Sequence, residues 1–378
     1  MIAKLFDAPV LANGSFQTLA SRHKGDTNRI ADYTYTKRWT KPGDFELTLP
    51  FDKELLSMLT LNGFICFDDG TEKDWLWIQE LDYNGKVITV SGKDCKGLLD
   101  LRIALYGATQ TAGAEGYDIV EGTTAQCLKH YLDHNCIGLT GNDAIRNLPF
   151  EWVGGASGLG GDSYMARFEY LSTIFTELCE GAGIGYDIRG DLSSASGTVP
   201  FKVHTLNGTA RNINQSTNTR VIFSLRHRNV LTQSFEHGVS NLYNSIYATG
   251  TDGMTLVTNR DSSAASGVAR RECNVSVSVE STDDWYSKYA LDQVSDNVEN
   301  HGYTLDVDGS GYGTDYTLGD KVTVLDDYTG NYYNTRITEV TKHYSASERR
   351  LTLTLGEPKQ KPLNRIVNSF LSGTARKR

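Results

Sequence analysis

The sequence predicts a mainly β protein that carries an α/β insertion. Polar and apolar residues alternate through much of the first hundred residues, which is the period-two pattern of half-buried strands. The chain holds 37 glycines but only 7 prolines, so glycine and asparagine are expected to make most turns. Its 20 tyrosines outnumber 13 phenylalanines and 5 tryptophans, which favours strands with one solvated face. With 378 residues, 39% of them hydrophobic, the chain is long enough for about two to three domains.

The first hundred residues contain the strongest strand patterns. One run places Tyr33, Tyr35, Lys37 and Trp39 on one face of a predicted strand. A turn at residues 41–44 leads into a second alternating strand over 45–49. The clearest hairpin joins residues 75–83 to 86–91 through Asn84-Gly85, a pair that favours a type I′ turn because both residues tolerate positive φ.

The pattern becomes helical after about residue 100. A helix is predicted from Thr123-Thr124 to about Cys136, with Ala125, Leu128 and Leu132 on its apolar side. A second helix contains apolar residues at helical spacing and ends at Gly181 and Gly183. Its apolar residues are Leu171, Ile174, Phe175, Leu178 and Ala182.

Strands are predicted again from Phe201 onward, and the last three cover residues 321–325, 335–340 and 351–355. One further helix is expected over residues 282–301, with Thr282 as N-cap and Gly302 just beyond its end. Residues 359–378 form an amphipathic, basic C-terminal tail. Its apolar residues Leu363, Ile366, Val367, Phe370 and Leu371 fall on one helical stripe.

The charge balance excludes an ordinary nucleic-acid-binding protein. Asp plus Glu number 46 against 37 Lys plus Arg, giving a net charge of −9, whereas phosphate binding needs a basic surface. Residues 1–9 hold no apolar signal-peptide core, and no apolar run is long enough for a transmembrane helix. The 6 cysteines are scattered without a C-x-x-C pair, so we expect free thiols and synthesis in a reducing cytoplasm.

One cluster in the first predicted helix could bind a metal. Cys127, His130 and His134 share a helical face, and with Cys136 they offer the sulfur and nitrogen donors that zinc prefers. Cys136 falls out of line with that face, and cysteine is commonly just a small buried hydrophobe. We therefore assign no metal and no cofactor, while whether these four residues bind zinc stays open.

Other motifs do not predict an active site. The Asp306-x-Asp308-x-Ser310-Gly311 run begins like a calcium loop, but its twelfth position is Thr317 instead of a bidentate Glu. The glycine-rich runs at 154–158 and 181–185 fit neither a nucleophile elbow nor a dinucleotide-binding loop. The carboxylate pairs at 68–69, 283–284 and 326–327 are typical of turns or a helix start. We predict no catalytic residues and no enzyme activity.

An ordered set of motifs resembles the siphovirus tail-associated hub proteins. It opens with Trp39 and PGDFELTLP at residues 42–50, and continues with the hairpin at 77–92 and residues 93–94 and 98–102. Weaker blocks follow in the family's order at 221–223, 241–247 and 269–272. The most specific block is YTLGDKVTV at 316–324, followed by ITEVT at 337–341. The resemblance covers nearly the whole chain to about Gly356.

The resemblance implies two tail-tube-like β-barrels per chain, plus smaller α+β domains, in a hub-like architecture related to contractile-tail baseplate hubs. The first barrel is expected in residues 1–100, completed by strands from 200–235, with the α/β insertion domain in 101–199. The second is expected in 236–358, with the helical insertion at 282–301. No receptor-binding or peptidoglycan-cleaving domain is expected, because only about twenty residues follow the last predicted strand.

The implied function is structural, in the virion at the distal end of the tail. A homotrimer would join the tail tube and distal tail protein to the tip and close or gate the DNA channel. Its partners would be those proteins, the tape-measure protein and a downstream tip or receptor-binding protein. DNA would only pass through the channel, and no stable membrane insertion is expected. Two alternatives stay open at this point, a carboxylate-based cell-wall hydrolase and a host-surface adhesin.

Overall fold

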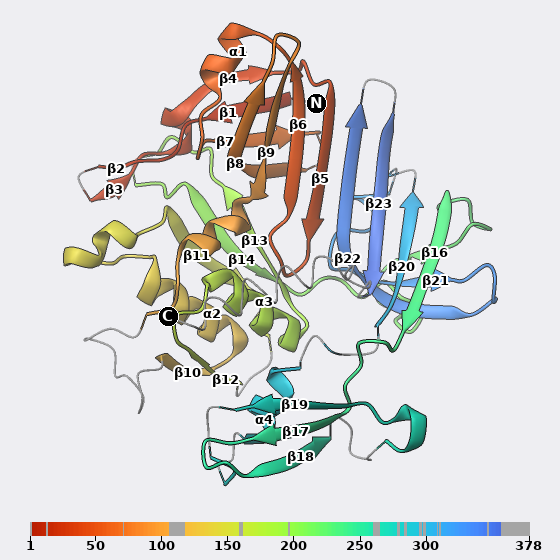
Figure 1. The fold of residues 1–378 in the computed structure, drawn as a ribbon. Helices are drawn as coiled ribbons and strands as arrows, with labels where there is room; N and C mark the ends of the chain where they lie inside the picture. Colours follow the sequence, from red (N-terminus) through yellow and green to blue (C-terminus); the bar gives the residue numbers. More distant parts are fainter. Residues whose placement is uncertain are drawn as a thin grey trace. The chain divides into compact units, whose positions relative to one another are not determined.

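A long mixed sheet dominates the computed structural model of the chain (Figure 1). The chain divides into two compact units, Met1–Gln233 with Leu305–Thr354, and Ser234–Thr304 with Leu355–Arg378. The structure describes residues 2–12, 14–70, 72–105, 118–158, 162–195, 197–259, 265–277, 280–282, 286–294, 297, 300–307, 309, 311–345 and 348–356. The predicted tail helix at 363–371 lies outside these residues.

The first seven strands of the long sheet come from the N-terminal hundred residues and pair in the order β5-β6-β9-β8-β7-β1-β4. They are β1 (Ile2–Phe6), β4 (His23–Thr27), β5 (Asp32–Arg38), β6 (Asp44–Pro50), β7 (Phe64–Asp68), β8 (Lys73–Tyr83) and β9 (Val87–Asp94). Their apolar side chains share one core with helix α1 (Lys53–Met58). Tyr33 and Tyr35 of β5 and Leu5 of β1 all belong to that core, so the sheet curls around it.

The curled sheet remains open, which corrects the expectation of a closed first barrel. Closure would require β5 to pair with β4, but β22 (Tyr332–Ser345) occupies that edge of β5. The pairing runs from Glu339 opposite Arg38 to Ser345 opposite Asp32. The strands expected to complete the barrel pair elsewhere in the described chain. Strand β14 (Phe201–Leu206) pairs with β11 (Phe150–Gly155) and β13 (Gly185–Gly190), and β15 (Ile222–Phe223) pairs with β21 (Lys321–Leu325).

The expected second barrel is likewise not closed among the described strands. The first part of β22 pairs with β21 (Lys321–Leu325), and the last part pairs with β5. Beyond β22 the sheet order is β23 (Arg349–Gly356), β20 (Asn300–Val307) and β16 (Thr232–Gly238), where the path ends. The long strand β22 thus connects the N-terminal strands of the sheet, through β5, to β21.

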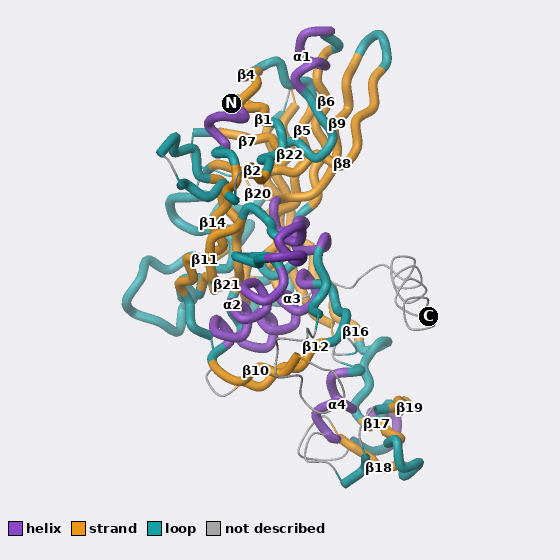
Figure 2. Tube along the Cα trace, turned by 90° about the vertical axis from the view of Figure 1, so that its left-hand side faces the viewer, coloured by secondary structure: helices purple, strands orange, loops and turns teal. Residues whose placement is uncertain are grey.

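The α/β insertion has its own small sheet, in the order β11-β14-β13, where β11 is Phe150–Gly155 and β13 is Gly185–Gly190. Helices α2 (Thr124–Asn135) and α3 (Leu171–Ala182) lie side by side next to it (Figure 2). Both helices confirm the sequence predictions. Thr123 and Gln126 form a capping box at the start of α2, and Gly183 ends α3 in the left-handed conformation with φ of 64°. The two-stranded antiparallel sheet of β10 (Asp118–Gly122) and β12 (Asp162–Ala166) also belongs to the insertion.

The second unit contains a three-stranded sheet in the order β18-β17-β19, with β17 at Ser245–Thr249, β18 at Thr255–Asn259 and β19 at Glu272–Ser276. Helix α4 (Tyr286–Asp292) packs on it, and the core includes Ile246, Ala248 and Tyr286. This helix is much shorter than the one predicted over 282–301, and Gly302 lies inside β20. Tyr303, Leu305 and Val307 are buried at alternate positions, so the period is that of a strand.

Two kinds of smaller element complete the described secondary structure. Strands β2 (Leu11–Ala12) and β3 (Ser15–Phe16) form a short hairpin. The 3-10 helices are Leu19–Arg22, Cys95–Leu101, Gly141–Arg146 and Gly267–Ala269. None of the helices in the described part of the chain is long and apolar enough to cross a membrane.

The hairpin predicted at Asn84-Gly85 is present, although its turn differs from the expected type. Strands β8 and β9 pair up to Tyr83 opposite Ile88, which confirms the hairpin. Neither Asn84 nor Gly85 has a positive φ, so the turn is not type I′. The Asn84 carboxamide oxygen instead accepts hydrogen bonds from the backbone N–H groups of Lys86 and Val87, at 2.9 and 3.1 Å.

Candidate functional site

The four residues considered for zinc separate into two environments. Cys127 and Cys136 are fully buried in the core of the α/β insertion, and burial raises the pKa of the Cys136 thiol to about 12. A thiol with so high a pKa stays protonated at neutral pH and packs as an apolar group. The only group of three or more His, Cys, Asp or Glu donors within 4.8 Å in the described chain contains neither cysteine.

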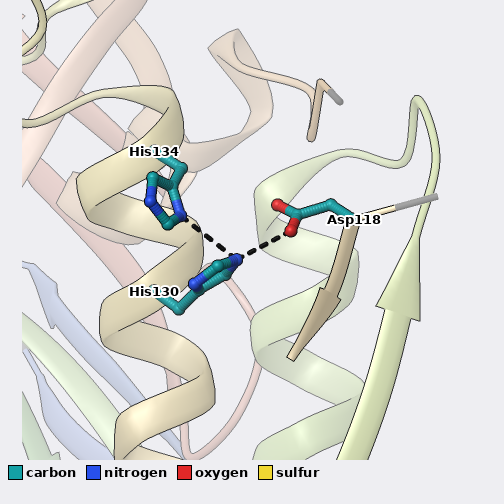
Figure 3. A group of neighbouring side chains, drawn as sticks. All are labelled: Asp118, His130 and His134. Carbon is teal, nitrogen blue, oxygen red and sulfur yellow. Dashed lines mark hydrogen bonds and ion pairs between the residues drawn. The ribbon is translucent and has the colours of Figure 1, made fainter. Parts of the chain in front are cut away.

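That group consists of Asp118, His130 and His134 (Figure 3). Helix α2 places the two histidines one turn apart on the same face, and Asp118 begins strand β10 opposite them. Nε2 of His130 lies 2.7 Å from Oδ1 of Asp118 and 3.1 Å from Nδ1 of His134. Burial and the neighbouring His130 lower the pKa of His134, which favours its neutral imidazole. Sequence reasoning missed Asp118 because it lies on another element and no spacing rule connects it to α2.

The Tyr131 hydroxyl holds this arrangement in place. It donates a hydrogen bond to the backbone carbonyl of Asp118 at 2.9 Å and also lies 3.3 Å from the carbonyl of Tyr164. Tyr131 of α2 is fully buried in the same core as Ala166 of β12, so the helix and the β10–β12 sheet pack together. The group is therefore attached to a packed part of the insertion.

A second concentration of titratable groups lines a cleft of about 470 Å³ in the first unit. Lys37 of β5, Glu72, Asp187 of β13 and Arg189 contribute to its wall. Behind the wall, Lys342 of β22 lies 2.8 Å from Oε2 of Glu72 and 2.7 Å from Oδ2 of Asp74. Lys37 also contacts Glu72, and its ammonium group lies 3.6 Å from Asp74 and 3.9 Å from Asp187.

The carboxylates of this cluster have opposite electrostatic environments. Burial, followed by the Glu72 charge, raises the pKa of Asp74 above its ordinary value. The Lys37 and Lys342 ammonium groups lower the pKa of Glu72 in spite of its burial. Lys37 and Arg189 likewise lower the pKa of Asp187 against the effect of burial. General acid catalysis needs an accessible carboxyl group with a raised pKa, but Asp74 is only 2% exposed. These three carboxylates therefore act as partners of buried cations.

The carboxylate pairs singled out in the sequence serve turns where they are described. Asp68 and Asp69 accept the backbone N–H groups of Gly70 and Glu72 at 3.0 and 2.9 Å. Asp326 accepts those of Tyr328 and Thr329, and Asp327 accepts that of Leu225. Residues 283–284 lie outside the described part of the chain.

The first residue of the calcium-like run also has protein partners. Asp306 is bound by the Thr232 and Thr352 hydroxyls at 2.6 and 2.7 Å, and by the Arg350 guanidinium. Asp308 and Ser310 fall outside the described residues. The oxygens of Asp306 are thus engaged in joining strands of the sheet.

Residues of the motifs that resemble the hub-protein family pack together around the Trp39 indole. The Trp39 indole is 5% exposed, and Gly185 and Gly319 lie so close to it that a Cβ at either would come within 2.4 Å of ring atoms. The Arg336 guanidinium lies over the same ring, 5.3 Å from its centre. Asp320, next to Gly319, accepts hydrogen bonds from the backbone N–H groups of Thr209 and Thr317 at 2.7 and 3.0 Å. The motifs at the two ends of the chain therefore meet in one packing arrangement.

Comparison with known proteins gives a family and a fold. Residues 17–357 match the family model of the siphovirus ReqiPepy6 Gp37-like proteins. None of the curated proteins matches the chain.

Three solved phage tail proteins have a similar fold. The 43 kDa tail protein of prophage MuSo2 from Shewanella oneidensis aligns with a TM-score of 0.57 at 14% identity, over 95% of this chain and 99% of that one. A tail protein from Neisseria meningitidis MC58 gives 0.52 at 14% identity, over 94% and 96%. Prophage tail protein gp18 from Listeria monocytogenes EGD-e gives 0.53 at 12% identity, over 100% and 99%.

The matched residues span nearly the whole of the described chain, and the fold agrees with that of the phage tail proteins. The chain therefore belongs to the family of the siphovirus ReqiPepy6 Gp37-like proteins, and its fold is similar to that of solved phage tail proteins.

Proposed function

We propose that the chain is the trimeric hub of a siphovirus tail tip. In this role it joins the tail tube and distal tail protein to the tip and closes or gates the DNA channel. The observation that carries the proposal is the match of residues 17–357 to a siphovirus family, combined with a fold shared with phage tail proteins over almost the full chain. The tape-measure protein and a downstream tip or receptor-binding protein are the further partners in this proposal.

The open sheets support assembly with other chains. Strand β18 lies at an edge of its sheet and exposes Leu256 at 43% and Val257 at 47%, next to Met254 at 56%. Successive residues of a strand point to opposite faces, so this edge is apolar on both sides. Exposed apolar edges promote pairing with another chain unless they are covered. We propose that a second copy of this chain covers β18 in the trimer.

The charge of the chain suits a DNA conduit. A net charge of −9 per chain gives a trimer a strongly negative total. Phosphate contacts would slow the passage of DNA, so a lumen that repels phosphate lets it move freely. We propose that acidic side chains dominate the channel wall and that lysine and arginine lie mainly on outer or intersubunit surfaces.

The cleft chemistry supports a structural role over hydrolysis. Cations lower the pKa of Glu72 and Asp187, the two carboxylates of the cluster that line the cleft, and the third carboxylate, Asp74, is buried behind the cleft wall. Incubating purified cell walls with the protein tests the hydrolase alternative, and the proposal expects no loss of turbidity. Binding of labelled protein to host cells tests the adhesin alternative, and here the proposal expects no binding.

Immunogold electron microscopy of virions tests the proposed position. Antibodies raised against the purified chain should label the distal end of the tail and leave the capsid and the length of the tube unlabelled. Antibodies against a tube protein provide the control, because they should decorate the whole tail. Label spread along the tube, or absent from the virion, would contradict the proposal.

A further inference from the structure

We infer that Asp118, His130 and His134 form a binding site for a divalent transition metal, with zinc as the best match. Two imidazole nitrogens and a carboxylate oxygen converge here within 4.8 Å of one another (Figure 3). The inference does not depend on the proposed function. It departs from the expectation of no bound metal, which was drawn from the sequence without Asp118.

A single hydrogen atom gives this convergence only weak hydrogen bonds. Nε2 of His130 faces both Oδ1 of Asp118 at 2.7 Å and Nδ1 of His134 at 3.1 Å. In a neutral imidazole that nitrogen carries either one proton or one lone pair. If it carries the proton, Asp118 and His134 must share that proton, and if it accepts from His134 its lone pair faces the carboxylate. A cation between the three atoms uses all of their lone pairs at once.

The second carboxylate oxygen provides an independent observation. Asp118 is 4% exposed, and its Oδ2 has no hydrogen-bond partner among the described residues. A buried carboxylate oxygen without a donor is costly, because its desolvation is not compensated. Coordination of a metal by both oxygens of the Asp118 carboxylate would remove that cost.

The spacing of the donors approaches that of tetrahedral zinc. Zinc–nitrogen and zinc–oxygen bonds of about 2.0–2.1 Å place neighbouring ligand atoms roughly 3.3 Å apart. Opening the observed 2.7 and 3.1 Å separations to this value requires only small side-chain movements at His130 and His134. Because His134 lies at the surface, a water molecule can reach the fourth position. Imidazole with carboxylate suits zinc, whereas calcium and magnesium prefer sites made of oxygen atoms alone.

Bound metal would join two elements of the α/β insertion. Asp118 lies on β10, and both histidines lie on α2, so coordination would connect the strand to the helix. A metal that binds the folded chain more tightly than the unfolded chain raises its stability. The temperature at which the first unit unfolds should therefore rise when zinc is added.

Calorimetric titration of the full chain with zinc, after dialysis against a chelator and then metal-free buffer, tests the inference. We expect one zinc per chain, and at least a tenfold loss of affinity in His134→Ala and in Asp118→Asn. His204→Ala is the matched control, because His204 lies on β14 outside the group and its loss should leave affinity unchanged. Equal zinc affinity of the wild type and His134→Ala, or no binding by the wild type, would overturn the site.

Cobalt substitution distinguishes this site from one built on the cysteines. Cobalt bound by nitrogen and oxygen should give a tetrahedral visible spectrum without the thiolate-to-metal charge-transfer band, and Cys127→Ala should bind it normally. A thiolate band, or loss of cobalt binding in Cys127→Ala, would assign the metal to the cysteine set instead. His134 is exposed, so circular dichroism of His134→Ala should match the wild type and show that the chain remains folded.

Discussion

The Lys342 ammonium group lies 2.7 Å from the Asp74 carboxylate, and both side chains are 1% exposed. The two residues are 268 positions apart in the sequence. They come from β22 and β8, and Lys342 reaches this place because β22 occupies the edge of β5. A buried ion pair of this kind is costly to break, because without Lys342 the nearest cation to the buried Asp74 carboxylate is the Lys37 ammonium, 3.6 Å away.

Removing Lys342 should therefore destabilise the first unit strongly. Lys342→Met leaves Asp74 buried without its closest cation, and we expect a loss of about 3–5 kcal/mol in the free energy of unfolding. Urea denaturation followed by tryptophan fluorescence measures this loss. The double variant Lys342→Met/Asp74→Asn should recover part of the stability. If the single variant costs less than about 1 kcal/mol, the pair does not hold the two strands as described.

Asp94 should make stability fall as the pH rises from 4 to 7. Burial raises its pKa to about 6, although the nearby Lys96 ammonium opposes that shift. Between the ordinary aspartate pKa near 3.9 and about 6, the folded chain holds a proton that the unfolded chain has lost. This contribution favours the folded state at low pH and disappears as the pH rises through 6.

Comparison of Asp94→Asn with the wild type isolates this contribution. Asparagine can keep the hydrogen bond that Asp94 accepts from the backbone N–H of Lys96 at 3.1 Å. The stability of the variant relative to wild type should increase by roughly 2 kcal/mol between pH 4 and pH 7. A difference that does not change with pH would show that Asp94 titrates at its ordinary pKa. Glu72, whose pKa is lowered, is present in both proteins and cancels from the comparison.

The contact between Gly185 and Trp39 predicts a different response at two glycines. A Cβ at Gly185 would lie 2.4 Å from the indole ring, so Gly185→Ala should cost about 1–3 kcal/mol of stability. Gly181 lies inside α3 with open space around the position of a Cβ, and Gly181→Ala should stabilise the chain by about 0.5–1 kcal/mol. Thermal denaturation of both variants measures the effects. Equal effects of the same sign would contradict the packing described for Trp39.

Local patterns predicted the elements whose cause lies within a short segment. The capping box of Thr123 and Gln126 starts α2, and the αL residue Gly183 ends α3, as expected from residues a few positions apart. The alternation of Tyr33, Tyr35 and Lys37 correctly predicted the buried face of β5. The helix expected over 282–301 is present as α4 but was predicted too long, because it was extended into the alternating residues of β20.

Long-range pairing decided what the sequence patterns did not show. The open edge of β5 could close a barrel or pair with another strand, and both give the same alternation in β5 itself. The pairing partner is β22, about 300 residues away, so no local pattern specifies it. The histidine group also depends on contacts between separate elements. The i,i+4 spacing in α2 indicated His130 and His134, but the third member, Asp118, lies on strand β10.

The exposed edge strand β18 should take part in the association of copies. Replacing both Leu256 and Val257 by lysine puts charge on an apolar edge, which discourages pairing with another chain. We expect the double variant to remain folded and to lose trimers at concentrations where the wild type retains them. Leu61→Lys is the control, since Leu61 is 58% exposed in the first unit and should not affect association. Analytical ultracentrifugation compares the three proteins, and unchanged association of the double variant would remove β18 from the interface.

The mass of the native particle tests the hub proposal most directly. One chain has a mass of 41.7 kDa. Native mass spectrometry or multi-angle light scattering of the purified protein at neutral pH should give three times that mass, stable on dilution to micromolar concentration. A particle with the mass of one chain or of two chains over the whole concentration range would contradict the trimeric hub.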